Sequence, residues 1–359
     1  MGEKEQLDIL RAKLDKLDNE IFDSLNERMK VVHEVGVLKA KTGGAIYRPE
    51  REKEIISRFQ AHNIAKKGLL DANAIESMFL EIFAISRNLE LPENIAYLGH
   101  EGSYTHEAAQ SRFGAMSSYL PVNSIKGIFS QVENKNAKFG VVPIENSSNG
   151  IVHDSIQALM KYDLKIIAEL VLDIHHVLAS TCLKVEEIKT IYSKDIAIDQ
   201  CSKFLENLGL DCVEFVRVES TTKAAKLATQ NPSSAAICSR VGAKNFSLPI
   251  LFENIEDIKS NKTRFIIISN FENAQSSCDK TSIIAKVANT HGALVSFLND
   301  FDKAKINLTK IKSHIIQGIS WHFIDFDGHK NDDNVKKIFD KYKDNIKFLG
   351  SYVKEIDDI

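Results

Sequence analysis

The sequence predicts a multidomain protein: an all-α region, then a two-lobed α/β region, then an α+β region of the ferredoxin-like type. Apolar residues recur at helical spacing over residues 1–92, and short apolar runs alternate with helical patterns over residues 93–272. The order strand, helix, strand, strand, helix, strand follows over residues 279–359. We take these three ranges as the expected domains, since 359 residues are enough for roughly two or three.

The composition is that of an ordinary globular protein. Hydrophobic residues make up 43% and charged residues 26%, and the net charge of -3 gives no general attraction to nucleic acid or anionic membranes. No apolar run approaches the length of a transmembrane helix or marks a secretory signal. The cysteines form no CxxC pair, which argues against a disulfide framework or a zinc site. We therefore expect a cytoplasmic protein without metal, in which locally placed Arg and Lys hold any anionic ligand.

Helical patterns fill the first region. The first runs from about Leu7 to Thr42, where a Gly-Gly pair follows as a helix-ending signal. The second begins at Pro49, because the first turn of a helix tolerates proline. The third runs from Asp71 to Glu90.

Arg11, Arg28 and Lys39 lie on the apolar seam of the first helix. A cation on a buried seam must reach solvent, pair internally or face an anion, and three together favour a bound anion. Arg28 and Lys39 are roughly 16 Å apart along the axis and could converge on one ligand. Arg11 lies roughly 25 Å from Arg28 and could instead reach the site of an antiparallel partner helix. The seam therefore predicts a dimer with shared sites.

Residues 1–92 resemble the all-helical chorismate mutase domain at the front of the bifunctional chorismate mutase/prephenate dehydratases. Seven residues fall on active-site positions of that family: Arg11, Arg28, Lys39, Arg51, Glu52, Ser86 and Glu90. The resemblance implies that the three arginines hold the carboxylates of chorismate and that the serine assists them. It also implies that Glu52 binds the ring hydroxyl, while Lys39 and Glu90 face the breaking ether oxygen. The pericyclic rearrangement to prephenate needs no cofactor.

Two positions depart from some relatives. Some relatives have Gln at the position of Glu90. The Gln amide can donate a hydrogen bond at any pH, whereas the Glu90 carboxyl can donate one only when it is protonated. We therefore expect mutase activity to favour acidic pH, unless the site raises the carboxyl pKa. An acidic residue can stand in place of Arg48, to which no role is assigned. An idle mutase domain remains an alternative.

Polar residues that start helices follow several strands expected in the second region, whose strands are predicted to be largely parallel. They stand at Gly102–His106, Glu145–Gly150, Ser193 and Ser220–Thr222. Ser and Thr cap helices, free N–H groups beside them bind anions, and open α/β sheets bind ligands at these strand ends. Any one of these alone is more often a plain cap or turn.

The stretches YLGHEGSYTHEAA, GVVPIENSSNG, IHHVL, IYSKDIAIDQCSKFL, ESTTKAA and NKTRF resemble the prephenate dehydratase domain, whose two lobes are of the periplasmic-binding-like type. The resemblance implies that prephenate loses carbon dioxide and its ring hydroxyl. Thr263 would assist the leaving hydroxyl, with Asn146, Ser193 and Gln200 as its catalytic neighbours. Prephenate would also contact Ser103, Glu145 and Arg264.

Three other residues of this region are not assigned a role in binding prephenate. Lys194 stands where some relatives have His, which leaves the surroundings of Ser193 in doubt. His175 and His176 could suggest a metal site, but adjacent side chains on a strand point to opposite faces and no Cys or carboxylate cluster stands nearby. We therefore interpret both as structural residues.

The third region resembles the ACT regulatory domain. Gly292, Ala293, Leu294 and Val295 match its GALV motif, and Ser313 is what remains of its ESRP motif at Lys312–Ile315. The resemblance implies that phenylalanine binds at these residues as a feedback effector. A purely structural dimerisation domain is the alternative.

The sequence as a whole favours an enzyme. A two-lobed domain with an ACT module could instead be a non-catalytic receptor, but the retained catalytic constellation argues against that. We expect a homo-oligomer, dimer or tetramer, that takes chorismate and prephenate as substrates, without nucleic-acid or membrane partners.

Overall fold

The computed structural model divides the chain into two compact units. The helical unit comprises Met1–Glu93 and Phe113–Ser118, and the sheet unit comprises Asn94–Arg112 and Tyr119–Ile359. The structure describes residues 3–42, 49–90, 94–276, 278–288, 290–316 and 319–355. Across these ranges, no helix combines the length and apolarity needed to cross a membrane. All five cysteines lie within them as free thiols.

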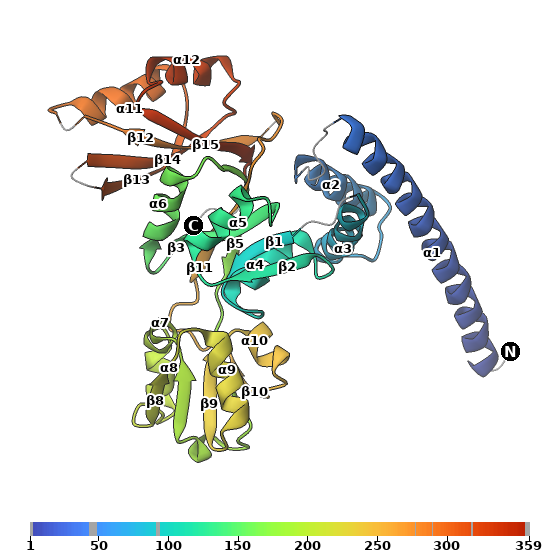
Figure 1. Cartoon of the computed structure of the whole chain (residues 1–359). Helices are drawn as coiled ribbons and strands as arrows, with labels where there is room; N and C mark the ends of the chain where they lie inside the picture. Colours follow the sequence, from blue (N-terminus) through green and yellow to red (C-terminus); the bar gives the residue numbers. More distant parts are fainter. Residues whose placement is uncertain are drawn as a thin grey trace. The chain divides into compact units, whose positions relative to one another are not determined.

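The helical unit contains the expected helices, α1 (Glu3–Thr42), α2 (Pro49–Ala65) and α3 (Ala72–Glu90) (Figure 1). Asp71 fixes the start of α3, because its carboxylate accepts a hydrogen bond from the backbone N–H of Ala74 at 2.7 Å. Both α1 and α2 pack on α3. The N-terminal half of the apolar seam of α1 remains exposed, with Leu14 and Ile21 each 58% exposed.

The sheet unit begins with lobe 1, whose sheet has the order β2-β1-β3-β11-β5, with β4 paired to β3. Its strands are β1 (Asn94–Leu98), β2 (Ser118–Val122), β3 (Phe139–Asn146), β4 (Gly150–Ile151), β5 (Lys165–Asp173) and β11 (Lys262–Ser269). Its helices are α4 (Tyr104–Phe113), α5 (Ile125–Glu133) and α6 (His153–Lys161).

The expectation of a largely parallel sheet is wrong for lobe 1. β1 and β3 are parallel, but β11 is antiparallel to both β3 and β5. The chain leaves lobe 1 at the end of β5 and returns at the start of β11. These two strand ends are therefore neighbours, and the strands must run in opposite directions.

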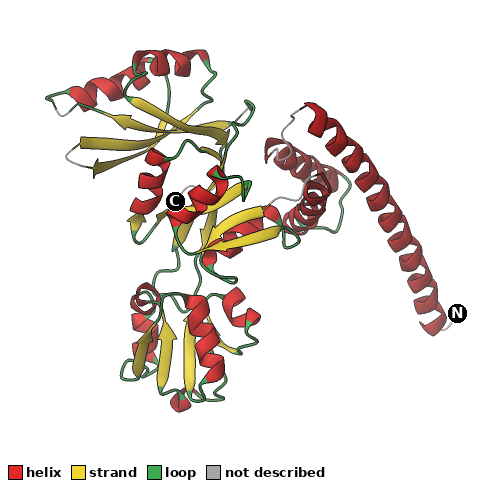
Figure 2. Ribbon diagram, in the orientation of Figure 1, coloured by secondary structure: helices red, strands yellow, loops and turns green. Residues whose placement is uncertain are grey.

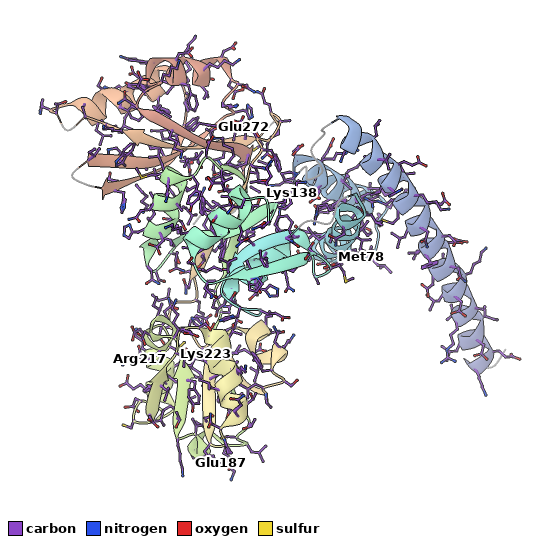
Figure 3. The ribbon with its side chains drawn as sticks, in the orientation of Figure 1. Met78, Lys138, Glu187, Arg217, Lys223 and Glu272 are labelled. Atoms are coloured by element: carbon purple, nitrogen blue, oxygen red, sulfur yellow. The ribbon has the colours of Figure 1, made fainter. Side chains whose placement is uncertain are left out.

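Lobe 2 has a sheet of order β10-β6-β9-β7-β8, in which β7 is parallel to β8 and β9. Its strands are β6 (Val177–Ser180), β7 (Thr190–Ser193), β8 (Glu214–Arg217), β9 (Ser234–Cys238) and β10 (Ile250–Glu253). Its helices are η1 (Val185–Glu187), α7 (Asp195–Asp199), α8 (Ser202–Asn207), α9 (Thr221–Gln230) and α10 (Arg240–Asn245) (Figure 2). In Figure 3, Arg217 and Lys223 mark one end of this lobe and Glu187 the other.

The C-terminal domain has the expected strand and helix order, with an antiparallel sheet in the order β13-β14-β12-β15. Its elements are β12 (Asp279–Lys286), α11 (Ala293–Lys303), β13 (Leu308–Ile316), β14 (Ile319–Asp327), α12 (Asp333–Lys341) and β15 (Ile346–Val353). The Gln317-Gly318 turn lies outside the described residues. Side chains alternate along β12, so Ile283 packs with α11 and α12 while Ile284 joins the core of lobe 1.

The junction between lobe 1 and the C-terminal sheet is a continuous core. Ile266 of β11 and Ile166 of β5 share one buried cluster with Ile284, Phe323 and Leu349 of the C-terminal sheet. Apolar burial of this kind stabilises the junction as it does a domain interior. The C-terminal domain is therefore a packed part of the sheet unit.

Candidate active sites

A cavity of about 760 Å³ lies between lobes 1 and 2. Several residues predicted to be functional line it: Ser103, Asn146, Gln200 and Thr263. They come from both lobes and from four separate segments of the chain. Its volume suits a small-molecule ligand.

Asn146 and Thr263 form a hydrogen-bonded pair in the wall of this cleft. They are partners on the antiparallel strands β3 and β11, and Asn146 Nδ2 donates to Thr263 Oγ1 at 2.9 Å. Asn146 Oδ1 accepts from the backbone N–H groups of Ser148 and Asn149 at 3.0 Å, which fixes the orientation of the amide. Because Thr263 Oγ1 accepts this hydrogen bond, its own hydroxyl proton is available to donate to a ligand.

Two helix N-termini border the same cavity from opposite lobes. Ser103 and Tyr104 stand at the start of α4 in lobe 1, and Ser220 and Thr221 stand at the start of α9 in lobe 2. Ser220 caps α9 by accepting from Lys223 N at 3.1 Å. Helix N-termini favour anions, so the cleft is suited to a ligand with carboxylates on both sides.

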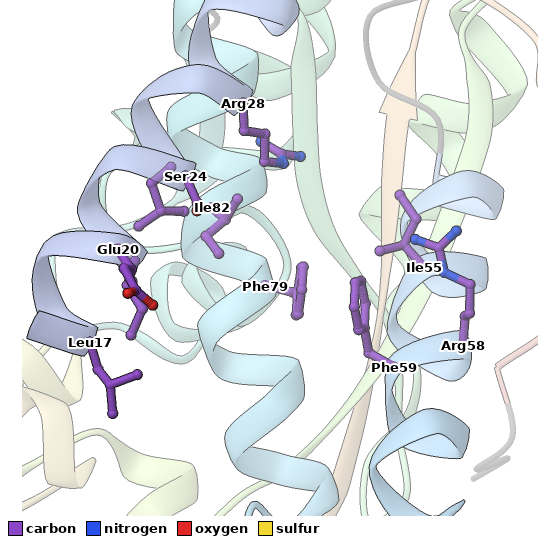
Figure 4. Close-up of a pocket in the computed structure, with 11 residues that line it drawn as sticks. Leu17, Glu20, Ser24, Arg28, Ile55, Arg58, Phe59, Phe79 and Ile82 are labelled. Carbon is purple, nitrogen blue, oxygen red and sulfur yellow. The ribbon is translucent and has the colours of Figure 1, made fainter. Parts of the chain in front are cut away.

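In the helical unit, Arg28 on α1 and Ser86 on α3 are brought together. Arg28 Nη1 donates to Ser86 Oγ at 2.5 Å, and Ser86 Oγ donates to the carbonyl of Ile82 at 2.6 Å. Arg28 also lines a groove of about 480 Å³. Figure 4 shows this groove between α1, α2 and α3, with the rings of Phe59 and Phe79 at its centre. These rings stack with centroids 4.5 Å apart.

Glu52 is buried and forms an ion pair with Arg87 of α3. Arg87 also donates from Nη2 to the carbonyl of Phe113 at 2.9 Å. The second oxygen of Glu52 is buried and has no hydrogen-bond partner among the described residues. The carboxylate therefore has one oxygen paired with Arg87 and one buried oxygen without a partner among the described residues.

The remaining residues predicted for this unit are more exposed. Arg11 pairs with Asp8 at 3.6 Å and Arg51 with Glu54 at 2.6 Å, both on the surface. Lys39 is half-buried near the end of α1. Arg48 and the side chain of Glu90 lie outside the described residues.

In the C-terminal domain, Gly292–Val295 open α11. Gly292 caps this helix with a φ of 76°, a conformation that favours glycine. Ser313 lies on β13, where its hydroxyl is 3.0 Å from Nδ1 of His322 on β14.

Two family models match this chain, one over each of the regions that carry these sites. Residues 10–91 match the family model of chorismate mutase type II, and residues 95–273 match that of prephenate dehydratase. A bifunctional chorismate mutase/prephenate dehydratase from Aquifex aeolicus is 36% identical over 98% of this chain and 99% of that protein. The chain belongs to this bifunctional family. A relative of the same name from Pseudomonas aeruginosa is also 36% identical, over 99% of this chain and 100% of that protein.

A solved structure supports the fold of the sheet unit. The prephenate dehydratase of Arthrobacter aurescens in complex with L-Phe is 28% identical, with a TM-score of 0.67 over 73% of this chain and 90% of that one. The chain is thus a bifunctional enzyme of phenylalanine biosynthesis with a mutase domain and a dehydratase domain. It rearranges chorismate to prephenate and converts prephenate to phenylpyruvate.

Within the dehydratase domain, three predicted site residues have partners away from the cleft. Ser193 is fully buried and donates from Oγ to the carbonyl of Ile237 at 2.9 Å. Glu145 pairs with Lys310, and Arg264 pairs with Asp325 at 2.6 Å. The expectation that Glu145 and Arg264 contact prephenate is corrected: each follows or precedes a cleft residue on a strand, so its side chain points to the opposite face.

The interpretation of His176 as purely structural also needs correction. His176 lines the dehydratase cleft, with Nε2 2.9 Å from Gln200 Oε1 and Nδ1 2.8 Å from the Tyr104 hydroxyl. Burial lowers the pKa of His176, so the ring is neutral at pH 7. His175 instead pairs with Glu256 at 2.7 Å.

Tyr104, His176, Lys194 and Thr221 also line the cleft, although none of them was predicted individually to contact the ligand. Tyr104 and Thr221 stand inside the motifs YLGHEGSYTHEAA and ESTTKAA, and those motifs were the available signal. Arg87 of the mutase domain was missed because its partner Glu52 is 35 residues away in the chain.

Proposed function

We propose that prephenate binds in the cleft between lobes 1 and 2 and that Thr263 and Asn146 act on its leaving ring hydroxyl. The observation that carries this proposal is the 2.9 Å hydrogen bond from Asn146 Nδ2 to Thr263 Oγ1 in the cavity wall. It directs the threonine proton toward the ligand and makes that hydroxyl a better donor.

The reaction needs little covalent participation by the protein. The bond from the ring to the carboxylate breaks and releases carbon dioxide, and its electron pair completes the aromatic ring. The bond from the ring to the hydroxyl oxygen breaks at the same time, and negative charge develops on that oxygen. Thr263 donates a hydrogen bond to this charge, which lowers the barrier because the donor is already oriented.

The carboxylates of prephenate lie at the N-termini of α4 and α9. Ser103 contributes at the first helix and Thr221 at the second, both in the cavity wall. Lys194 borders the same cavity and supplies a cation where some relatives have His. Gln200, held by His176, orients the substrate between the lobes. Ser193 serves this site indirectly, through its place in β7 directly before Lys194.

In the mutase domain, Arg28 and Ser86 hold a carboxylate of chorismate. The Glu52 oxygen that has no partner among the described residues accepts a hydrogen bond from the ring hydroxyl of chorismate. Arg51 holds the second carboxylate, and Lys39 and Glu90 face the ether oxygen. Arg11 serves the site of a second copy in a homodimer or larger homo-oligomer. The exposed apolar seam of α1 supports this arrangement, because a partner helix would cover it.

The C-terminal domain is an ACT domain that binds phenylalanine as a feedback effector at Gly292–Val295 and Ser313. Its strand and helix order supports this, as does the L-Phe complex of the Arthrobacter aurescens relative. Phenylalanine that neither binds nor inhibits would contradict the assignment.

The free thiols are consistent with a cytoplasmic location. The domain limits are 1–92, 93–272 and 279–359.

The proposal for the dehydratase site is tested with Thr263→Val and Thr263→Ser. The first keeps the shape and removes the hydroxyl, so kcat with supplied prephenate should fall by about 10²-fold or more. The second retains a hydroxyl and should keep most of the activity. Thermal midpoints of the same samples, measured by circular dichroism, control for folding of the sheet unit. Undiminished dehydration by Thr263→Val would refute the assigned role.

A further inference from the structure

Next to the Asn146–Thr263 pair, the strands β3 and β11 carry a second cross-strand pair whose side chains point away from the cleft. Thr263 is paired with Asn146, and Arg264 is paired with Glu145. Side chains of adjacent residues on a strand point to opposite faces. Thr263 and Asn146 face the cleft, so Arg264 and Glu145 face the C-terminal sheet.

Glu145 is held by the C-terminal strand β13. Lys310 of that strand donates to Glu145 Oε2, and Lys312 lies 3.6 Å from Oε1. Glu145 is buried, and the side chain of Lys310 is only 15% exposed. An ion pair of this kind has a strongly preferred geometry, because breaking it would leave a charge without a partner in a low-dielectric site.

Arg264 is held in the same way by β14. Its Nη1 donates to Asp325 at 2.6 Å, its Nε to Glu169 at 2.8 Å, and its Nη2 to the Tyr352 hydroxyl at 3.0 Å. Lys280 approaches the other oxygen of Glu169 at 2.8 Å, so the cations Arg264 and Lys280 balance the anions Asp325 and Glu169. The four charged side chains are each at most 3% exposed.

The backbone between the two faces is irregular. The pairing of β11 with β3 shifts register between Arg264 and Phe265. Such an irregularity re-aims the neighbouring side chains, so the strand direction at Thr263 depends on what anchors the adjacent residue. The anchors come from β13 and β14.

We propose that Glu145 and Arg264 are positioning residues, through which β13 and β14 of the C-terminal domain hold the Asn146–Thr263 pair in its productive geometry. This inference rests on the roles proposed above for Asn146 and Thr263. Neither Glu145 nor Arg264 touches the substrate. Their loss should therefore lower kcat of the dehydratase and leave its KM for prephenate nearly unchanged.

The test uses Lys310→Met and Asp325→Asn in the full chain. Each removes the C-terminal partner of one positioning residue and leaves the dehydratase domain's own residues intact. Each should lower the dehydratase kcat by about 10-fold or more with KM changed less than about twofold, because small misplacements of catalytic groups are costly. Lys310→Arg keeps the cation and should restore most of kcat.

Two controls separate positioning from general destabilisation. Lys354→Met removes an ion pair with Asp327 at 2.9 Å inside the C-terminal domain and should leave the dehydratase kcat at the wild-type value. Mutase activity of every variant, measured with chorismate, should also stay at the wild-type value.

The inference is overturned if Lys310→Met and Asp325→Asn keep the wild-type dehydratase kcat, or if these variants change KM and not kcat. It is also overturned if Lys354→Met lowers the dehydratase kcat as much as they do. Equal losses of mutase and dehydratase activity would also overturn it. Full activity of Thr263→Val would instead show that the proposed catalytic role, on which the inference rests, has failed.

Discussion

Glu52 and Arg87 form an ion pair that is almost fully buried in the mutase domain. Arg264 and Glu169 do the same in the dehydratase domain. Buried pairs contribute little when intact, since the attraction is offset by the loss of hydration. Removing one member is strongly destabilising, because the other charge stays buried without a partner.

Arg87→Met is therefore expected to destabilise the helical unit. The change keeps most of the side-chain volume and leaves Glu52 unpaired, which should lower the free energy of unfolding by about 3–5 kcal/mol. Lys30→Met, which removes an exposed pair with Glu27 at 2.6 Å, should cost below about 1 kcal/mol. Urea denaturation followed by helical circular dichroism measures both. Equal losses in the two variants would contradict the prediction.

The pKa of Glu169 makes acid stability a test of the buried cluster. Burial raises this pKa, but the cations Arg264 and Lys280 together outweigh burial and hold it below its usual value of 4.5. A carboxyl with a lowered folded-state pKa stabilises the fold above its unfolded-state pKa and loses that contribution as pH falls through the folded-state value.

We accordingly expect Glu169→Gln to lower the stability of the fold by the same amount from about pH 7 to pH 5. The loss should become smaller as the pH falls below 4.5, the usual pKa of a Glu side chain. Thermal midpoints of wild type and Glu169→Gln, compared at each pH by circular dichroism, measure this. A penalty that stays the same in acid would show that Glu169 is not held ionised.

At the scale of secondary structure, β15 packs closely against β5 where the C-terminal sheet meets lobe 1. Gly350 makes this possible, because a Cβ there would lie 2.0 Å from the carbonyl oxygen of Ile166. Lys347 reinforces the same junction by donating to the carbonyls of Met160 and Tyr162 at 2.8 Å, at the C-terminal end of α6.

Gly350→Ala should force β15 away from β5 and destabilise the sheet unit by about 3 kcal/mol or more, since the clash is with backbone. Gly209→Ala is the control: its φ is also positive, at 68°, but its Cβ would meet nothing within 4 Å. Backbone strain alone should cost about 1 kcal/mol there. Chemical denaturation measures the free energy of unfolding of both variants. If Gly350→Ala lowers it no more than Gly209→Ala does, the packing argument is contradicted.

At the scale of the whole molecule, the N-terminal half of α1 leaves its apolar seam exposed within the part of the chain that the structure describes. Leu14 and Ile21 are each 58% exposed, and Phe22 is 66% exposed. Apolar surface of this extent usually marks an interface. Arg11 lies on the same helix, so a partner that covered the seam would bring its own Arg11 to the site of the first copy.

Mixing two inactive variants tests this sharing. Arg11→Ala and Arg28→Ala should each disable every mutase site of the proposed homodimer. In a mixed dimer, the Arg11→Ala chain keeps its own Arg28 and receives Arg11 from its partner, so one of its two sites is intact. Unfolding and refolding an equal mixture should restore about a quarter of wild-type mutase activity. Activity no higher than that of the separate variants would rule out shared sites.

Much of this architecture could be predicted from local sequence patterns. Helical periodicity predicted α1 and the Gly43-Gly44 break its end at Thr42, although the helix begins at Glu3 and not at Leu7. Strand and helix alternation predicted the two-lobed domain. The motifs PIENS and TRF pointed to Asn146 and Thr263, which the structure joins at 2.9 Å. These signals are local, since a few neighbouring residues carry them.

What the sequence did not reveal depends on contacts between distant segments. The antiparallel direction of β11 follows from the path of the chain through lobe 2. The partners of Glu145 and Arg264 lie 165 and 61 residues away, at Lys310 and Asp325. The place of His176 in the cleft was not visible in the sequence, because its cleft neighbours Tyr104 and Gln200 are 72 and 24 residues distant.

One chain of this family member carries out two successive reactions at two separate sites. A time course of the purified wild-type chain with chorismate, in which chorismate, prephenate and phenylpyruvate are all quantified, measures both reactions together. Prephenate should rise and then fall as phenylpyruvate accumulates to the amount of chorismate consumed. Prephenate that persists without phenylpyruvate, or chorismate that is not consumed at acidic or neutral pH, would contradict it.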